Sequence, residues 1–196
     1  MGSFPCGMLG AMAIVAGTHF GPWREEDLSG LPDEARGYEL LEGTLLVNPP
    51  PGGRHQAVSR KLANLLEAAV GSGLMAVQEL GVRLPDNTMF IPDVLVANRE
   101  VVLANTSGIL DPTDVTLVAE IVSPGSRIMD RLTKPAAYAG VGIPSYWRIE
   151  LENGPVIFAF GLEGGRYVEL GAARPGEQLV VNEPFAVSID PAELQP

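Results

Sequence analysis

Residues 115–123 read VTLVAEIVS, a run that is apolar on both sides of the single acid Glu120. Such a run predicts a central strand that is covered on both faces of a sheet. A carboxylate inside that strand is costly unless it is paired or holds a metal ion. Glu120 is therefore either half of an ion pair with a neighbouring arginine or part of a functional site.

A second acid interrupts the next apolar run upstream. Residues 89–97, MFIPDVLVA, predict another strand, in which Asp93 follows Pro92. Proline confines this position to an edge or an end of a strand, so Pro-Asp is read either as a turn pair or as the mouth of a site. Because the two predicted strands would be neighbours, the site reading brings Asp93 and Glu120 together.

Lys134 follows Glu120 in the segment DRLTKPAAYAGVGIPSYW, residues 130–147. Asp130, Lys134 and Tyr138 would share one helix face, so a solvated Asp130–Lys134 ion pair is one interpretation. The other is chemical, because two carboxylates and a lysine are the minimum set for metal-assisted phosphodiester hydrolysis. The acids would hold the cation, and the lysine would stabilise charge on the phosphate.

The rest of the pattern predicts a single α/β domain with an N-terminal extension. The extension would cover residues 1–22 and the domain residues 23–196. The order of a strand pair, a helix, three strands, a helix, a strand and a hairpin is typical of this class. The expected elements are hairpins around Glu42-Gly43 and Glu163–Gly165, helices at 54–70 and within 126–140, and further strands at 75–84 and 145–151.

Charge argues against an ordinary nucleic-acid binder, because the net charge is −11. The acidity is peripheral, since residues 54–134 contain eight Lys/Arg and nine Asp/Glu. The single Cys6 and two histidines exclude a Cys/His zinc site and an internal disulfide, which fits a cytoplasmic protein. The apolar start lacks the basic flank of a signal peptide and the length of a membrane span, so no membrane partner is expected.

Several segments together resemble a known family. They are YELLEGTLLVNPPP, RHQAVSRKL, VRLPDNTMFIPDVLVA, VAEIVSPGSR and DRLTKPAAYAGVGIPSYW, within about residues 23–151. Their order and spacing are similar to the Uma-two family of restriction endonucleases, in the PD-(D/E)XK nuclease superfamily. The resemblance implies a restriction-endonuclease-like fold, which is a mixed central β-sheet flanked by helices with additional β-hairpins.

The resemblance also implies a set of site residues. The superfamily lysine normally lies two residues after the acid, where this chain has Val122, and Lys134 fits a lysine moved to the following helix. Asp93, Glu120 and Lys134 would be catalytic, and Asp93, Glu120 and the Ile121 carbonyl would bind Mg²⁺ or Mn²⁺. His55 and Arg127 would contact the substrate; otherwise His55 only starts a helix and Arg127 is a surface charge.

The implied activity is hydrolysis of DNA by a magnesium-dependent endonuclease. Double-strand cutting would favour a two-fold homodimer. The rival reading is a catalytically inactive nuclease fold that binds a partner or a nucleic acid, and the acidic composition and the absence of a lysine at position 122 favour it.

Overall fold

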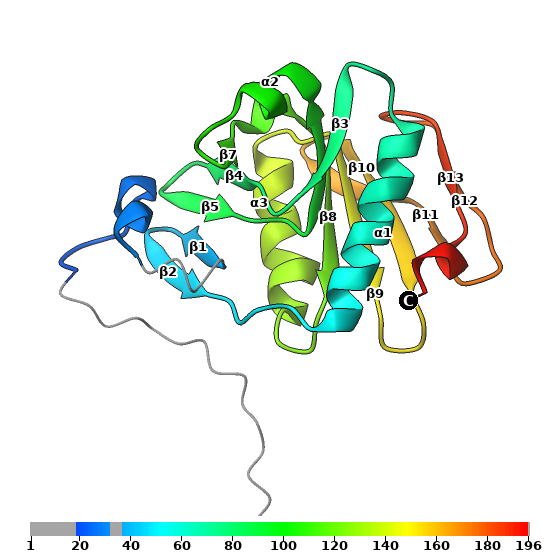
Figure 1. Ribbon diagram of the computed structural model, residues 1–196, viewed down its shortest axis with the longest axis horizontal. Helices are drawn as coiled ribbons and strands as arrows, with labels where there is room; N and C mark the ends of the chain where they lie inside the picture. The colour runs from blue at the N-terminus through cyan, green and yellow to red at the C-terminus, as the bar shows by residue number, and fades with distance from the viewer. Residues whose placement is uncertain (1–18, 32–36, 196) are drawn as a thin grey trace, which may run out of the picture.

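The computed structural model describes residues 19–31 and 37–195, which form a mixed α/β fold (Figure 1). The predicted N-terminal extension over residues 1–22 lies almost entirely outside the described residues. Helices pack against a large sheet, and a second sheet lies at one side of it. The predicted class, a mixed central sheet with flanking helices and extra hairpins, is confirmed.

The large sheet has six strands in the order β11-β10-β9-β8-β6-β3. Strands β8 and β9 pair in parallel, and the other neighbours are antiparallel. The predicted central strand is confirmed, because β8 has a neighbour on each side and is buried from Leu117 to Val122. The strands are β3 (Leu74–Gln78), β6 (Val94–Asn98), β8 (Val115–Val122), β9 (Ser145–Glu150), β10 (Val156–Glu163) and β11 (Arg166–Ala173).

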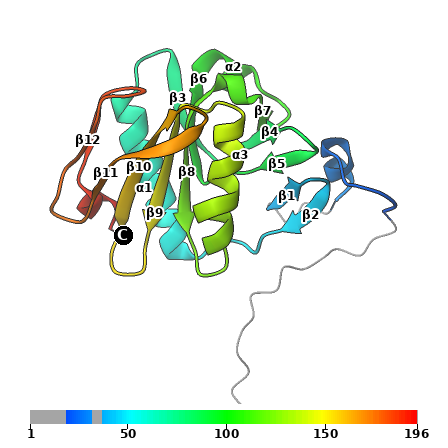
Figure 2. The ribbon, with the colours of Figure 1, turned by 180° about the vertical axis from the view of Figure 1, so that it is seen from behind.

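Helices cover both faces of this sheet. Helix α1 (Gly53–Ala69) lies on one face and α3 (Lys134–Gly140) on the other, as the opposite views in Figures 1 and 2 show. In α1, Val58, Leu62 and Leu66 recur every fourth residue and are buried against the sheet. Side chains alternate along β8, so Glu120 shares the α3 face with Val118.

The second sheet has the order β2-β1-β5-β4-β7. The predicted hairpin between its first two strands is confirmed, with Glu42 at φ 50° and Gly43 at φ 74°. Two successive positive φ angles are typical of the tight turn that joins antiparallel strands. The strands are β1 (Tyr38–Leu41), β2 (Thr44–Val47), β4 (Gly81–Leu84), β5 (Thr88–Phe90) and β7 (Ile109–Leu110).

Two predicted strands are each broken in the structure. The strand expected at 75–84 is split into β3 and β4 at Glu79, which has φ 56°. The strand expected at 89–97 is split into β5 and β6 around Pro92, which has no N–H for a ladder. In both cases the two halves join different sheets, so Asp93 lies at the corner where the chain passes between them.

The remaining elements complete the α3 face and the C-terminal edge. The helix expected within 126–140 is confirmed as a π-helical turn, η3 (Met129–Thr133), that leads into α3. The short helix α2 was not predicted, because its six residues show no apolar periodicity. None of the described helices has the length and apolarity needed to cross a membrane. The other elements are α2 (Arg99–Ala104), the pair β12 (Leu179–Val181) and β13 (Val187–Ile189), and 3₁₀ turns at Glu25–Gly30, Pro112–Asp114 and Pro191–Leu194.

Candidate functional site

Asp93 and Glu120 are brought together by the pairing of β6 with β8. Val94 lies opposite Ala119 in this antiparallel ladder, so the preceding Asp93 reaches the level of Glu120. The backbone N–H of Ile121 donates a hydrogen bond to Asp93 Oδ2 at 2.7 Å. The aspartate is thereby tied to the strand that carries the glutamate, at the end of β8.

Lys134 reaches the same place from the start of α3. Its Nζ lies 3.1 Å from Glu120 Oε1 and 2.9 Å from Glu39 Oε1. The lysine is only 6% exposed, so the interpretation of a solvated surface pair with Asp130 is wrong. The partner of Glu120 is this lysine rather than a neighbouring arginine.

Glu39 is the main site residue that the sequence reading missed. It lies on β1, is buried, and accepts hydrogen bonds from Asn48 Nδ2 and from the backbone N–H of Ile91, each at 2.7 Å. One signal could have identified it. Like Glu120, it is a single acid within an apolar strand, YELL, where a buried charge needs a partner.

Tyr138 completes the polar contacts of Glu120. It lies one helical turn after Lys134 and is fully buried, and its hydroxyl donates to Glu120 Oε1 at 3.0 Å. Burial raises the pKa of Tyr138 well above its usual value, so the hydroxyl stays protonated. The i, i+4 spacing of the two side chains was visible in the sequence, but the role of the tyrosine was not.

The charges at this site are mutually dependent. Burial raises the pKa of Glu120, and the ammonium of Lys134 opposes that rise. Burial by itself lowers the pKa of Lys134, but the Glu120 and Glu39 carboxylates outweigh it and raise the pKa well above the usual lysine value. Lys134 is therefore a fixed cation at neutral pH.

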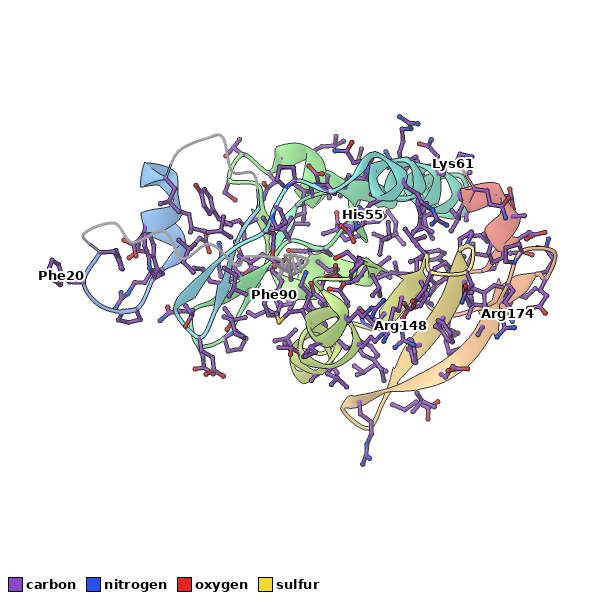
Figure 3. The ribbon with its side chains drawn as sticks, turned by 90° about the horizontal axis from the view of Figure 1, so that it is seen from below. Phe20, His55, Lys61, Phe90, Arg148 and Arg174 are labelled. Atoms are coloured by element: carbon purple, nitrogen blue, oxygen red, sulfur yellow. The ribbon has the colours of Figure 1, made fainter. Side chains whose placement is uncertain are left out.

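His55 lies in the first turn of α1 (Figure 3), and its side chain contacts two residues of the site. Its Nε2 lies 3.0 Å from the Ile121 carbonyl oxygen and 3.2 Å from Asp93 Oδ2. Burial lowers the pKa of His55, but its contacts with Asp93 and Ile121 raise it overall. The histidine does more than start a helix, since it contacts two of the three groups expected to bind a cation.

Asp130 is a further buried carboxylate, and it lies in η3 four residues before Lys134. Ser126 donates its hydroxyl to the Asp130 side chain, and the Tyr146 hydroxyl donates to the Asp130 backbone carbonyl. Burial raises the pKa of Asp130 to about 6. The residue is too enclosed to be the surface ion-pair partner that helical spacing suggested.

The residues at the end of β8 fit a hard divalent cation. Asp93, Glu120 and the Ile121 carbonyl offer only oxygen donors, which Mg²⁺ and Mn²⁺ prefer. Within residues 19–31 and 37–195, no cluster of three or more His, Cys, Asp or Glu side chains is placed to hold a metal. Two carboxylates and a carbonyl suffice for Mg²⁺, which usually keeps several of its waters.

Arg127 lies outside this group. Its guanidinium is 3.4 Å from Glu152, and its side chain is 46% exposed. The structure gives it no contact with Asp93, Glu120 or Lys134 among the described residues. Arg127 could therefore bind only a part of the substrate that extends beyond the scissile phosphate.

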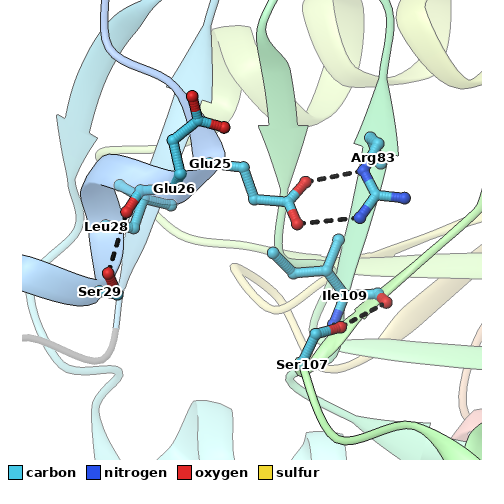
Figure 4. Close-up of a pocket in the computed structure, with 7 residues that line it drawn as sticks. All are labelled: Glu25, Glu26, Leu28, Ser29, Arg83, Ser107 and Ile109. Carbon is cyan, nitrogen blue, oxygen red and sulfur yellow. Dashed lines mark hydrogen bonds and ion pairs between the residues drawn. The ribbon is translucent and has the colours of Figure 1, made fainter.

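A hollow of about 600 Å³ on the second sheet does not belong to the site (Figure 4). Its one cation, Arg83, pairs with Glu25 at 2.7 Å and with Asp111 at 2.9 Å. The hollow has no buried charge that lacks a partner. The hollow lies between the first 3₁₀ turn and β4, where Glu25 contacts Arg83.

Comparisons with known proteins concern the family and the fold of the chain. The family model Uma2, described as a putative restriction endonuclease, matches residues 26–192. A crystal structure of a putative nuclease belonging to DUF820 from Anabaena variabilis superposes with a TM-score of 0.70 at 18% identity, covering 88% of this chain and 97% of that one. No curated protein sequence matches the chain.

Proposed function

Since the chain belongs to the Uma2 family, we propose that it is a metal-dependent endonuclease that hydrolyses phosphodiester bonds in DNA. The observation that carries the proposal is the position of the Lys134 ammonium, 3.1 Å from Glu120 at the end of β8. The neighbouring N–H of Ile121 holds Asp93 at the same strand end. These contacts support the proposal, because two acids and a lysine are the minimum set for metal-assisted phosphodiester hydrolysis.

Asp93, Glu120 and the Ile121 carbonyl would hold Mg²⁺ or Mn²⁺. When bound, such a cation supplies an activated water and polarises the scissile phosphate. The chain holds these donors in place through its own contacts. Tyr138 and Lys134 both bond to one oxygen of Glu120, and the Ile121 N–H and His55 both contact one oxygen of Asp93.

Lys134 is suited to stabilising negative charge that develops on the phosphate. An ammonium has three donors, and the carboxylates of Glu39 and Glu120 take two of them. The ammonium also lies over the face of Phe90, 5.6 Å from the ring centroid. The third donor would bind an oxygen of the substrate phosphate.

The rival function is a nuclease fold that only binds its partner. The net charge of −11 favours this reading, because binding to a polyanion depends strongly on cationic contacts. The retained Asp93, Glu120 and Lys134 favour the enzyme. If the enzyme cuts both strands of a duplex, a two-fold homodimer in the cytoplasm would supply the second site.

A cleavage assay separates the two functions. Supercoiled plasmid and single-stranded DNA are incubated with the protein in Mg²⁺, in Mn²⁺ or in EDTA. Cutting is expected with a divalent cation and not with EDTA. Asp93→Asn should abolish it, since the amide still accepts from the Ile121 N–H but loses the charge that attracts a cation.

Asp86→Asn is the matched control. Asp86 lies in the exposed turn between β4 and β5, so the same chemical change there should leave the rate unaltered. If both variants cut at the wild-type rate, Asp93 has no role in the reaction. If the wild type cuts no nucleic acid under any of these conditions, the binding reading replaces the enzyme.

A further inference from the structure

A groove of about 550 Å³ lies over the ends of β9, β10 and β11. Its lining combines three arginines, Arg131, Arg148 and Arg174, with the ring of Phe158. Figure 3 shows Arg148 and Arg174 on this side of the large sheet, beyond α3. No residue of the groove takes part in the site described above.

The groove is nevertheless next to that site. In the parallel pairing of β8 with β9, Arg148 is the register partner of Glu120. Neighbouring strands are about 4.8 Å apart, and register partners project from the same face of a sheet. Arg148 therefore lies beside Glu120 on the same face of the sheet.

The groove has a net positive charge in spite of the acidic composition, because its three arginines outnumber its two acids, Glu150 and Glu152. Arg131 makes two contacts of 2.9 Å with Glu150, and Arg148 lies 3.1 Å from the same carboxylate. Arg174, at the end of β11, is exposed and has no ion pair among the described residues. The arginines therefore exceed the acids that pair with them.

Arg148 is held as a flat, pre-oriented donor. Its guanidinium carbon lies 4.7 Å from the centroid of Phe158 and 5.5 Å from that of Phe160. Its buried Nε has no hydrogen-bond partner in the described part of the chain, because the approach of Glu150 lacks hydrogen-bond geometry. Stacking fixes the plane of the guanidinium and leaves its edge available to a planar or tetrahedral anion.

We propose that this groove binds backbone phosphates of the nucleic-acid strand beside the scissile phosphate, with Arg148 and Arg174 as the phosphate contacts. The proposal rests on the proposed function, since it assigns a subsite of the same substrate. Arginine recognises phosphate through paired N–H donors, and a stacked arginine loses little freedom on binding.

Binding is measured apart from cleavage. Fluorescence anisotropy follows a labelled single-stranded DNA of about 16 nucleotides, the upper end of usual single-strand sites, and the matching duplex, in EDTA and in Ca²⁺. Arg148→Gln and Arg174→Gln should each raise the Kd about fivefold and reduce the salt slope by about 0.7 for the single strand. Far-ultraviolet circular dichroism confirms that the variants are folded.

Arg166→Gln is the matched control. Arg166 is an exposed arginine at the opposite end of the same β10–β11 hairpin. Its removal should change the Kd less than twofold. Equal effects of Arg174→Gln and Arg166→Gln overturn the proposal, as does a wild type that binds neither DNA in EDTA or in Ca²⁺.

The binding and cleavage assays together distinguish a failure of the groove assignment from a failure of the proposed endonuclease function. If the wild type binds DNA through Arg148 and Arg174 but never cuts it, the groove stands and the endonuclease does not. If the wild type cuts DNA and both groove variants bind like Arg166→Gln, the endonuclease stands and the groove assignment is wrong.

Discussion

Replacing Lys134 by Met tests whether this lysine is the counter-charge of two buried acids. Its Nζ contacts Glu39 and Glu120 at 2.9 and 3.1 Å, and the carboxylate side chains are each 3% exposed. Methionine keeps most of the aliphatic stem but leaves both acids without a cation. Breaking a buried ion pair on one side costs about 3–5 kcal/mol. At about 2–4 °C per kcal/mol for a chain of this size, the Tm should fall by about 6–20 °C.

Thermal unfolding followed by circular dichroism, at neutral pH without metal, measures this loss. The chain has one other lysine, Lys61, which donates to the Gln195 carbonyl near the surface. Lys61→Met is the matched control and should change stability by about 0.5 kcal/mol or less. The loss in Lys134→Met should shrink at acidic pH, because protonation of the carboxylates removes the uncompensated charge.

A double variant tests whether the stability lost in Lys134→Met comes from the unpaired acids. Adding Glu39→Gln to Lys134→Met removes one of the two unpaired acids, so the double variant should recover part of the lost stability. If Lys134→Met melts within about 1 kcal/mol of the wild type, or if Glu39→Gln restores nothing, Lys134 is not the counter-charge that the geometry indicates.

Two further predictions concern neighbouring buried groups. Burial raises the pKa of Asp130 to about 6, so the folded protein holds a proton that the unfolded chain releases, and wild-type stability should fall as pH rises from about 4 to 6. Urea unfolding should therefore show Asp130→Asn gaining up to about 3 kcal/mol relative to the wild type between pH 4 and 7; a difference that does not vary with pH would contradict this. Tyr138→Phe removes the donor to Glu120 at 3.0 Å and should cost about 1–3 kcal/mol in the same assay, whereas an unchanged urea midpoint would show that this hydrogen bond contributes nothing.

The sequence predicted the elements that local patterns determine. The strand around Glu120, the helix over 54–70 and the hairpin at Glu42-Gly43 each follow from apolar periodicity or turn chemistry, and the structure confirms them. The residues 75–84 and 89–97 carry strand-like composition throughout. Their division between two sheets depends on long-range pairing, which periodicity does not record.

The site residues, too, could be predicted only where a local pattern marks them. Glu120 was found because a charge inside an apolar run demands a partner. Glu39 lies far from it in the chain, and only the packing of β1 against the start of α3 makes both acids partners of Lys134. The helical spacing of Asp130 and Lys134 suggested a surface pair, since spacing on a helix does not reveal how deeply that face is buried.

The central claim is that Asp93 and Glu120 form one site for a divalent cation, and calorimetric titration of Mn²⁺ tests it most directly. The wild type should bind Mn²⁺ at a single site, and Asp86→Ala, in the exposed turn between β4 and β5, should bind it equally well. Asp93→Ala should lose the binding while keeping the wild-type circular dichroism spectrum. A wild type that binds no Mn²⁺, or an Asp93→Ala variant that binds it with unchanged affinity, would contradict the account.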